Sequence, residues 1–382
     1  MKNKIVLLFF MSASLFATSA SHAQKLPGKK KTLKTMELAN AYFMKKWPDA
    51  GNPIVHPDRT RPSNIWTRAV YYEGLMAFYA VSPHQRYLEY VLQWGQKHSW
   101  GLPYGQTATR NADNQACGQT YIDLYLMDKD PVKISNIKAS IDSMINTPKI
   151  DDWNWIDAIQ MAMPVFARLG FVYRDTSYYN RMFQMYMFTR NKHGVNGLFN
   201  EQEGLWWRDK DFVPPYNEPN GEDCYWSRGN GWVIASLVRT MDFLPETSPY
   251  FAVYLNDFRK MAAALVPVQR KDGYWNVSLH DSIHFGGKEL SGTALFTYGL
   301  AWGINKGYLD RTVYLPVVVK AWNAVVKHSV HPDGMLGFVQ GTGKEPRDGQ
   351  PVAYDHTANF EDFGLGCFLL AGSEICRLKK ID

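Results

Sequence analysis

The chain has 382 residues, of which 46% are hydrophobic and 14% aromatic, and its formal net charge is +6. Basic and acidic side chains are interspersed, apart from three lysines at 29–31, so no concentrated basic stripe of the kind that binds nucleic acid is present. No stretch after residue 23 reaches the roughly 18 consecutive apolar residues that a membrane-spanning helix requires. We therefore expect neither nucleic acid nor a membrane as a partner.

The first 23 residues have the features of a secretory signal peptide. Two lysines precede an apolar run over residues 5–16, and residues 21–23 form a small-x-small cleavage site. We therefore expect an exported protein, periplasmic or secreted, that is a monomer or weak homodimer. A basic linker is expected over residues 24–33.

Helical spacing of apolar residues recurs along the chain, whereas strand-like alternation is scarce. Six segments mix small and large apolar residues with few charges, as buried helices do: 68–82, 112–127, 154–170, 227–244, 291–309 and 359–378. Six amphipathic segments alternate with them: 31–47, 84–99, 131–146, 176–190, 249–266 and 312–329. This alternation predicts an all-α fold, a single-domain (α/α)6 barrel over residues 34–378, followed by a tail over 379–382.

The four cysteines raise the question of disulfides in an exported chain. Cys367 and Cys376 lie nine residues apart on one predicted helix, which places them on opposite faces and prevents them from bridging each other. We expect buried free thiols.

In a barrel of this kind the N-terminal ends of the inner helices meet at one mouth. The segments that enter those ends are polar, aromatic and rich in glycine: NADNQ (111–115), DDWNW (151–155), EDCYWSRGNGW (222–232), HFGGKELSG (284–292) and the region 331–362. Their convergence predicts a pocket at that mouth.

Several familiar motifs are incomplete or missing. GNGWVI (229–234) lacks the third glycine of a dinucleotide loop, and GTGKEP (341–346) has Glu345 where a phosphate loop needs serine or threonine. There is no HExxH or CxxC, and the ten histidines show no metal-ligand spacing. We therefore expect no cofactor, nucleotide or metal.

Two carboxylates remain as candidates for chemistry. Asp113 and Asp157 each stand at the start of a predicted buried helix, and these helices are neighbours in the barrel. Each aspartate could simply cap its helix. Together, at a mouth rich in tryptophan, they favour an acid–base pair, because a neighbouring carboxylate and an apolar environment both raise the affinity for a proton.

An arginine and several tryptophans accompany these carboxylates. Arg228, at the first turn of a buried helix, is either a salt-bridged loop arginine or a group that holds an anion. Trp155, Trp226 and Trp232 lie in the same loops, and tryptophan in a polar loop favours stacking on a sugar ring over filling a core.

Five stretches carry a family resemblance: DNQACGQTYIDLY, WIDAIQMAMPVFARLG, WSRGNGWV, SGTALFTYGLAWGINKGYL and EDFGLGCFLLAGSE. Together they resemble the unsaturated rhamnogalacturonyl and glucuronyl hydrolases of glycoside hydrolase family 105. The resemblance implies an (α/α)6 barrel. It also implies an exo-acting site that removes a 4,5-unsaturated uronic acid from the non-reducing end of oligosaccharides that polysaccharide lyases generate.

The resemblance also implies roles for individual residues. Asp157 matches the general acid/base and Asp113 the second essential carboxylate of that family. Arg228 and Trp232 match residues that hold the unsaturated sugar, and Trp155 and Trp226 match aromatic walls. Two histidines of many relatives are replaced, one by Asn200 and one at or near Asn146, which leaves recognition of the neighbouring sugar open.

Three other interpretations remain. The polymer could be ulvan, a glycosaminoglycan or an arabinogalactan, cleaved by an unsaturated glucuronyl hydrolase. The barrel could be a sugar 2-epimerase or a polysaccharide lyase, for which His284 and His356 are the available histidines in loops at the mouth. It could also bind carbohydrate without catalysis, although the presence of both Asp113 and Asp157 argues against this.

Overall fold

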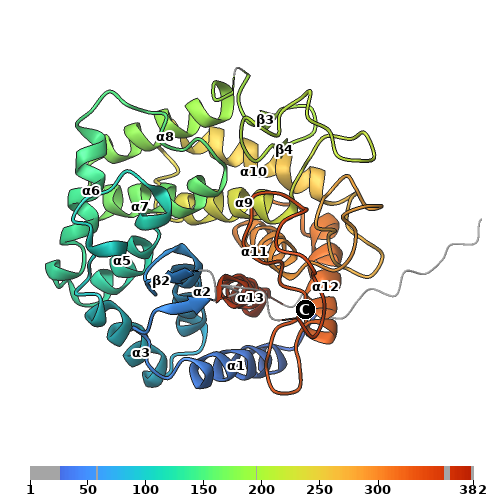
Figure 1. The fold of residues 1–382 in the computed structure, drawn as a ribbon, viewed down its shortest axis with the longest axis horizontal. Helices are drawn as coiled ribbons and strands as arrows, with labels where there is room; N and C mark the ends of the chain where they lie inside the picture. The colour runs from blue at the N-terminus through green and yellow to red at the C-terminus, as the bar shows by residue number, and fades with distance from the viewer. Residues whose placement is uncertain (1–25, 57–58, 195, 357–361, 380–382) are drawn as a thin grey trace, which may run out of the picture.

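The computed structural model describes residues 26–56, 59–194, 196–356 and 362–379, so the expected signal peptide lies outside the described residues. Helices arranged in a ring dominate the molecule (Figure 1). An inner set of helices is enclosed by an outer set, and the connections between them include long loops and two small hairpins. The predicted all-α barrel is confirmed.

The inner ring is built from helices whose residues are buried nearly all round. Its members are α2 (Trp66–Val81), α4 (Ala112–Gln115) with α5 (Cys117–Asp128), α7 (Asp157–Tyr173), α9 (Ser227–Met241), α11 (Leu290–Lys306) and α13 (Asp362–Arg377). Successive members pack against each other, and the ring closes where α13 packs on α2. This closure depends on glycine, because a Cβ at Gly366 would lie 2.2 Å from the carbonyl oxygen of Val70.

The outer ring consists of α1 (Lys29–Lys46), α3 (Gln85–Lys97), α6 (Ser135–Ile145), α8 (Thr176–Asn191), α10 (Phe251–Leu265) and α12 (Arg311–His328). The first of these begins earlier than expected. Helix α1 starts at Lys29, inside the segment that we expected to be a linker, and Thr32 is already buried. At the other end, Leu378, the last residue of the predicted barrel, is buried against the core.

Two hairpins and one helix break were not predicted. Strands β1 (Ile54–His56) and β2 (Arg59–Arg61) pair antiparallel, as do β3 (Phe199–Asn200) and β4 (Leu205–Trp206). Two or three residues per strand are too few for periodicity to reveal. The predicted helix over 112–127 is divided at Ala116, which keeps helical dihedral angles. Short 3₁₀ turns η1 (Pro103–Gly105) and η2 (Pro131–Lys133) complete the connections.

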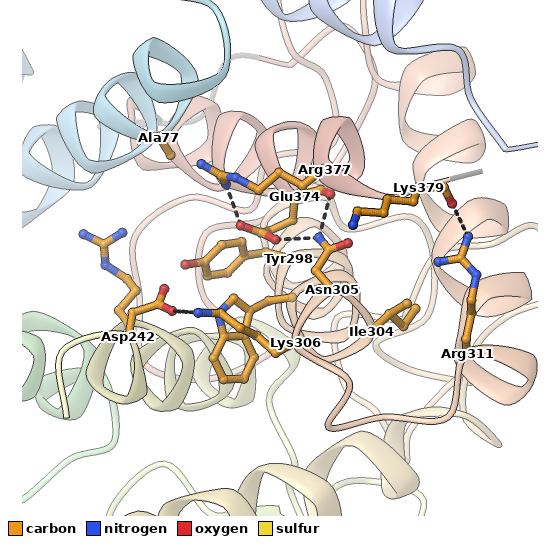
Figure 2. A pocket seen from close by; sticks show the side chains of 12 residues that line it. Ala77, Asp242, Tyr298, Ile304, Asn305, Lys306, Arg311, Glu374, Arg377 and Lys379 are labelled. Atoms are coloured by element: carbon orange, nitrogen blue, oxygen red, sulfur yellow. Dashed lines mark hydrogen bonds and ion pairs between the residues drawn. The ribbon is translucent and has the colours of Figure 1, made fainter. Parts of the chain in front are cut away.

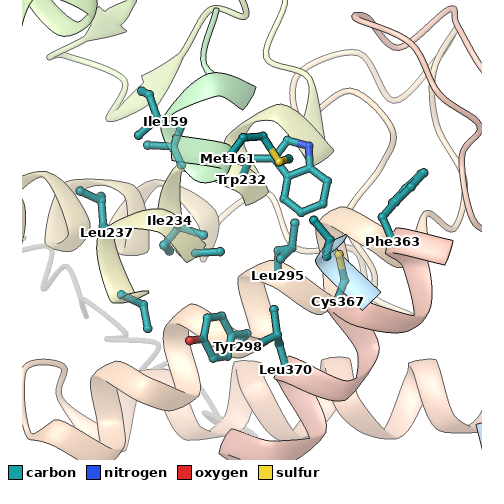
Figure 3. Close-up of a cluster of buried hydrophobic side chains, with 14 of the residues drawn as sticks. Ile159, Met161, Trp232, Ile234, Leu237, Leu295, Tyr298, Phe363, Cys367 and Leu370 are labelled. Atoms are coloured by element: carbon teal, nitrogen blue, oxygen red, sulfur yellow. The ribbon is translucent and has the colours of Figure 1, made fainter. Parts of the chain in front are cut away.

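The apolar core lies between the inner helices. Figure 3 shows Met161 of α7, Trp232 of α9, Leu295 of α11 and Phe363 of α13 gathered in one cluster. Each fully buried side chain of this size stabilises the fold by about 1.5–3 kcal/mol relative to exposure. All four cysteines are buried free thiols, as expected.

A buried polar network crosses the interior of the ring. The Arg239 guanidinium donates to Gln119 at 2.7 Å and lies 3.4 Å from the Glu73 carboxylate, which also accepts from Gln160 at 2.9 Å. Burial raises the pKa of Glu73 to about 7, against the lowering effect of Arg239. Such a network joins the inner helices by directional contacts in addition to apolar packing.

The ring has two ends with different chemistry. At the C-terminal ends of the inner helices, a cavity of about 600 Å³ contains ion pairs between its own residues, such as Lys306 with Asp242 and Arg377 with Glu374 (Figure 2). Four helix C-termini meet there, and cations complement their partial negative charge. The charged residues of this cavity, at the C-terminal ends of the inner helices, are therefore explained by their ion pairs and by the helix termini. The opposite end contains both predicted carboxylates.

Within the described residues, no helix is both long and apolar enough to cross a membrane. The same part of the chain contains no group of three or more histidine, cysteine or acidic side chains placed to hold a metal ion.

Candidate active site

A cavity of about 370 Å³ opens at the mouth where the inner helices begin. Its volume falls within the range of small-molecule pockets. The lining comes from β2, from the starts of α2, α4 and α7, and from two loops: Arg59, Arg61, Trp66, Asp113, Trp155, Asp157, Met161, Arg208, Thr342, Gly343, Lys344 and Asp348. Asp113, Asp157 and Trp155 are thus brought together as the sequence predicted.

Asp113 does not cap its helix. The cap of α4 is Asn111, whose Oδ1 accepts hydrogen bonds from the backbone N–H groups of Asp113 and Asn114, at 2.9 and 3.4 Å. Among the described residues, the Asp113 carboxyl makes no hydrogen bond that would stabilise its charge. The side chain is therefore free to face the cavity.

The surroundings of Asp113 favour the protonated form. Burial, and after it the nearby negative charge of Asp157, raise its pKa to about 7, while Arg208 and Arg61 act in the opposite direction. Burial and a like charge both disfavour ionisation of a carboxyl group. Asp113 consequently holds a proton through much of the range below neutral pH.

Asp157 has a different environment. It is the first residue of α7, where no side chain caps the helix, and its residue surface is 9% exposed. Its Oδ2 accepts a hydrogen bond from Nε of Arg208 at 3.2 Å. A guanidinium beside a carboxylate stabilises the ionised form. The two carboxyl groups therefore share a cavity but differ in their ionic partners.

Arg208 was not predicted from the sequence. It follows β4, and its carbonyl accepts from the backbone N–H of Ile156 at 2.9 Å, which fixes the segment beside the start of α7. Its Nη1 donates to Asp209 at 2.6 Å, and Asp209 pairs with Trp155 in an isolated β-bridge. The only signal in the sequence was an Arg-Asp pair directly after two tryptophans, which is too common to single out.

Arg228 is a buried anchor and does not line the cavity. Its Nη1 and Nη2 donate to the carbonyl oxygens of Gln340 and Gly341, both at 2.8 Å, and its guanidinium lies over the Trp226 ring. Trp226 in turn donates from Nε1 to Oε1 of Gln340 at 2.8 Å. These two residues hold the loop that places Thr342, Gly343 and Lys344 in the cavity wall.

Trp232 is also outside the lining. It is fully buried in the cluster of Figure 3, and its ring makes edge contact with Trp66 at 6.2 Å between centroids. Trp66, which sequence reasoning missed, and Trp155 are half-buried and form the aromatic walls. Trp226 and Trp232 were expected to contact the sugar, but both are buried and neither lines the cavity. They support the cavity wall from behind.

The cavity wall carries four cationic side chains, Arg59, Arg61, Arg208 and Lys344, against three carboxyl groups, Asp113, Asp157 and Asp348. Asp348 accepts from the backbone N–H of Lys344 at 2.9 Å and so belongs to the loop itself. With Asp113 protonated, the balance is positive. The cavity therefore suits an anionic ligand.

Several other polar residues near this mouth bind partners outside the cavity or are exposed to solvent. Asp152 pairs with Arg110 and Asp151 with Lys149, so these adjacent aspartates do not enter the cavity. Asn200 donates to the Tyr225 hydroxyl at 2.8 Å, and Asn146 is exposed at the end of α6. Neither asparagine lines the cavity, so the expected pocket position at or near Asn146 is not Asn146 itself.

The sequence profile of Glycosyl Hydrolase Family 88 matches residues 35–379. An unsaturated 3S-rhamnoglycuronyl hydrolase of Formosa agariphila is 32% identical over 88% of this chain and 89% of its own length. A protein of the same name from an Alteromonas species is 30% identical over 85% and 80% of the two chains. These matches extend over almost all of the barrel.

Solved structures give the same result. A glycosyl hydrolase family 88 protein from Bacteroides vulgatus superposes with a TM-score of 0.83 at 30% identity, covering 92% of this chain and 99% of its own. A structure described as a polysaccharide lyase has the same TM-score at 32% identity, covering 91% and 97%. The resemblance to unsaturated uronyl hydrolases that the sequence suggested is confirmed. The chain belongs to Glycosyl Hydrolase Family 88, and it is a glycosidase.

Proposed function

We propose that this glycosidase removes a 4,5-unsaturated uronic acid from the non-reducing end of lyase-generated oligosaccharides, by acid-catalysed hydration of the C4=C5 double bond. The observation that carries the proposal is the placement of Asp113 and Asp157 in one cavity with unlike ionic surroundings. Two carboxyl groups with unlike surroundings can serve as the acid and the base of one reaction.

The reaction suits these groups. The substrate contains an enol ether conjugated to a carboxylate. A carboxylic acid protonates C4, positive charge develops at C5 and the ring oxygen, and water adds to C5 while the other carboxylate takes its proton. The hemiketal that results opens and expels the neighbouring sugar. No covalent nucleophile is required, in contrast to glycosidases that cleave by attack at the anomeric carbon.

The positive wall supports an anionic substrate. Arg208 offers Nη2, which makes no hydrogen bond within the described residues, and Arg59, Arg61 and Lys344 add further positive charge. Trp66 and Trp155 offer flat faces to sugar rings. The names of the two relatives make an unsaturated glycuronyl group on a 3S-rhamnose the first substrate to test. Unsaturated rhamnogalacturonyl and glycosaminoglycan ends are the alternatives.

We also propose that the protein is exported, to the periplasm or beyond the cell, and acts as a monomer or weak homodimer. Export rests on residues 1–23, whose lysines, apolar run and small-x-small site fit a signal peptide. An extracytoplasmic enzyme would meet lyase products where they arise or enter.

The competing activity with an observation in its favour is a polysaccharide lyase, because one structural relative is described as such. A lyase needs a tyrosine or histidine base beside a group that neutralises the uronate. Within the described part of the chain, the cavity lining includes neither residue type, and His284 is bonded to Asp281 at 2.9 Å. The residues that line the cavity therefore favour a hydrolase over a lyase. An epimerase would need a pair of histidines, which the lining also lacks.

The ultraviolet absorbance of the conjugated enol ether separates the activities. The purified protein would be incubated with unsaturated disaccharides from several lyase digests and with the intact polysaccharides. Loss of absorbance on a disaccharide, with release of the neighbouring sugar, supports the proposal and identifies that sugar. A rise in absorbance on an intact polymer would show a lyase, and unchanged absorbance on every substrate would refute the proposed reaction.

A further inference from the structure

A second open cavity, of about 520 Å³, lies where α5 and α7 end and α8 begins. Helices α5 and α7 are neighbours in the inner ring (Figure 1). The cavity is lined by three aromatic rings, those of Tyr125, Phe171 and Tyr179, and by two cations, Lys129 and Arg174. Among the described residues, no carboxyl group lines it. Its chemistry therefore differs from that of the cavity of Figure 2, where acids and bases pair with each other.

The two cations have no acidic partner in the part of the chain that the structure describes. The acids next to them in the sequence bind elsewhere. Asp128 pairs with Lys133, and Asp175 accepts a hydrogen bond from a backbone N–H of α8 at 2.8 Å. Lys129 and Arg174 therefore present uncompensated positive charge to the cavity.

Both cations occupy a backbone conformation that glycine usually adopts. Lys129, with φ of 62°, and Arg174, with φ of 53°, are the left-handed C-caps of α5 and α7. For a residue with a side chain, this conformation costs more than the attraction of an exposed cation to a helix C-terminus contributes. The helix ends alone therefore do not explain a lysine and an arginine at these two positions.

The aromatic rings give the same cavity an apolar face. Phe171 is 51% exposed, which is unusual for so large a hydrophobic side chain. The Lys129 ammonium lies 5.3 Å from the centroid of the Tyr125 ring, and the Tyr179 hydroxyl donates to a backbone carbonyl at 3.1 Å. A pyranose ring offers C–H groups to an aromatic face, and its carboxylate or sulfate accepts hydrogen bonds from a guanidinium. The cavity is therefore complementary to an acidic sugar.

We propose that this cavity is a second carbohydrate site, which binds a chain of intact acidic polysaccharide by stacking on Phe171 and by ion pairs with Lys129 and Arg174. Phe171 and Asp157 lie near opposite ends of α7 (Asp157–Tyr173), about 20 Å apart along its axis at about 1.5 Å per residue. The site therefore holds the polymer without taking part in catalysis, and it keeps the enzyme where lyases release its substrate. The choice of an acidic glycan rests on the proposed function, whereas binding requires no turnover.

Binding of the whole protein to intact ulvan and intact rhamnogalacturonan tests this site, by affinity electrophoresis and calorimetry. Desulfated, carboxyl-reduced polymer is the neutral control and should not bind. The double variant Lys129→Gly with Arg174→Gly removes both cations and suits the left-handed conformation. It should weaken binding by about 2–25-fold, from about 1.4–5-fold for each exposed ion pair. Its Tm should equal or exceed that of the wild type, because glycine relieves the backbone strain.

Two further variants separate the site from general effects of charge and surface. Phe171→Ala removes the exposed ring and should weaken binding several-fold while both cations remain. The double variant Lys192→Gln with Arg259→Gln removes one lysine and one arginine that are exposed elsewhere, and it should bind as the wild type does. All of these proteins should hydrolyse an unsaturated disaccharide at the wild-type rate, since the substitutions lie away from Asp113 and Asp157.

Several results would overturn the proposal. Absence of binding by the wild type, or wild-type binding by the glycine variant, would remove the site. A lower Tm of the glycine variant with unchanged binding would assign the cations to the helix ends. Competition by inorganic sulfate as effective as by an acidic disaccharide would show a simple anion site. Loss of a concentration-dependent dimer in Phe171→Ala, with polymer binding intact, would show an interface between two copies.

Failure of the proposed function gives a different result. Polymer binding that depends on Phe171, Lys129 and Arg174, with no loss of absorbance on any unsaturated disaccharide, would refute the proposed hydration and leave this second site standing.

Discussion

Asn111 caps helix α4 by accepting a hydrogen bond from the backbone N–H of Asp113 at 2.9 Å, and this relationship releases the Asp113 side chain from any structural duty at the helix start. An aspartate at such a position would ordinarily satisfy the free N–H groups itself. Here a neighbouring amide does so. The carboxyl group is left buried in the cavity lining, and its raised pKa keeps it protonated below neutral pH.

Replacement of either cavity aspartate by its amide should abolish most activity while the fold persists. Each substitution removes one carboxyl group of the proposed acid–base pair, and general acid–base catalysis contributes about 10²–10⁴-fold. We expect kcat to fall by that factor on an unsaturated disaccharide, with KM changing far less. Asp152→Asn, which alters an aspartate paired with Arg110 outside the cavity, is the control and should retain catalysis. Full activity in Asp113→Asn would contradict the assignment.

The buried Asp113 carboxyl group should lower the free energy of unfolding at alkaline pH. Its pKa is raised from 3.8 to about 7 in the folded state, so the folded state binds more protons than the unfolded state between these values. Stability therefore falls as pH rises from about 4 to about 7 and stays lower above that range. Asp113→Asn should raise Tm over wild type by more at about pH 8 than at about pH 5. An equal difference at both pH values would show that the Asp113 pKa is not raised.

Arg228 should stabilise the cavity wall and the fold. Hydrogen bonds to a charged group contribute about 1.5–3 kcal/mol each, so losing both bonds to the 340–341 carbonyls should lower the free energy of unfolding by about 3–6 kcal/mol. KM should rise in Arg228→Gln, because Thr342 and Lys344 lose their support. Arg259→Gln, whose exposed guanidinium also donates to a carbonyl, is the matched control and should cost under about 1 kcal/mol. Equal effects of the two variants in chemical denaturation would refute the anchoring role.

Positive charge in the wall should favour substrates with a second anionic group. Lys344→Gln removes a cation from a loop whose backbone bonds to Asp348 are kept. We expect KM to rise several-fold for an unsaturated disaccharide whose neighbouring sugar is sulfated, and to change little for the unsulfated form. The loss of one surface-type ion pair corresponds to about 0.2–1 kcal/mol, or about 1.4–5-fold. A change in KM of the same size for both disaccharides would argue against such a contact.

The sequence was sufficient for the architecture because the signal for buried helices is strong. Segments such as 227–244 and 291–309 are apolar nearly all round, and these are the observed α9 and α11. Asp113 and Asp157 could be placed together because helix starts converge in a barrel. The β1–β2 hairpin, which brings Arg59 and Arg61 to the cavity, could not be found, since its strands are three residues each.

Arg228 and Trp232 show a second limit of sequence-based prediction. Their motif correctly marked the mouth, but a sequence does not reveal whether a side chain faces a cavity or the layer behind it. Both are buried behind the wall, while Trp66 and Arg208, which are partly buried, line the cavity. The hydrogen-bond partners of a buried arginine depend on how segments that are distant in the sequence pack together. Arg228, for example, donates to the carbonyl oxygens of residues 340 and 341.

The most direct test of the hydration chemistry compares two unsaturated uronides that differ only in the atom linking the sugar to its leaving group, oxygen in one and sulfur in the other. If a carboxylic acid protonates C4, the linking atom is not protonated in the slow step, and the absorbance of both compounds should be lost at similar rates. If the enzyme instead protonates the linking atom and cleaves at the anomeric carbon, the oxygen-linked compound would be consumed and the sulfur-linked compound, which is poorly protonated, would remain intact. The second result would contradict the mechanism proposed for Asp113 and Asp157.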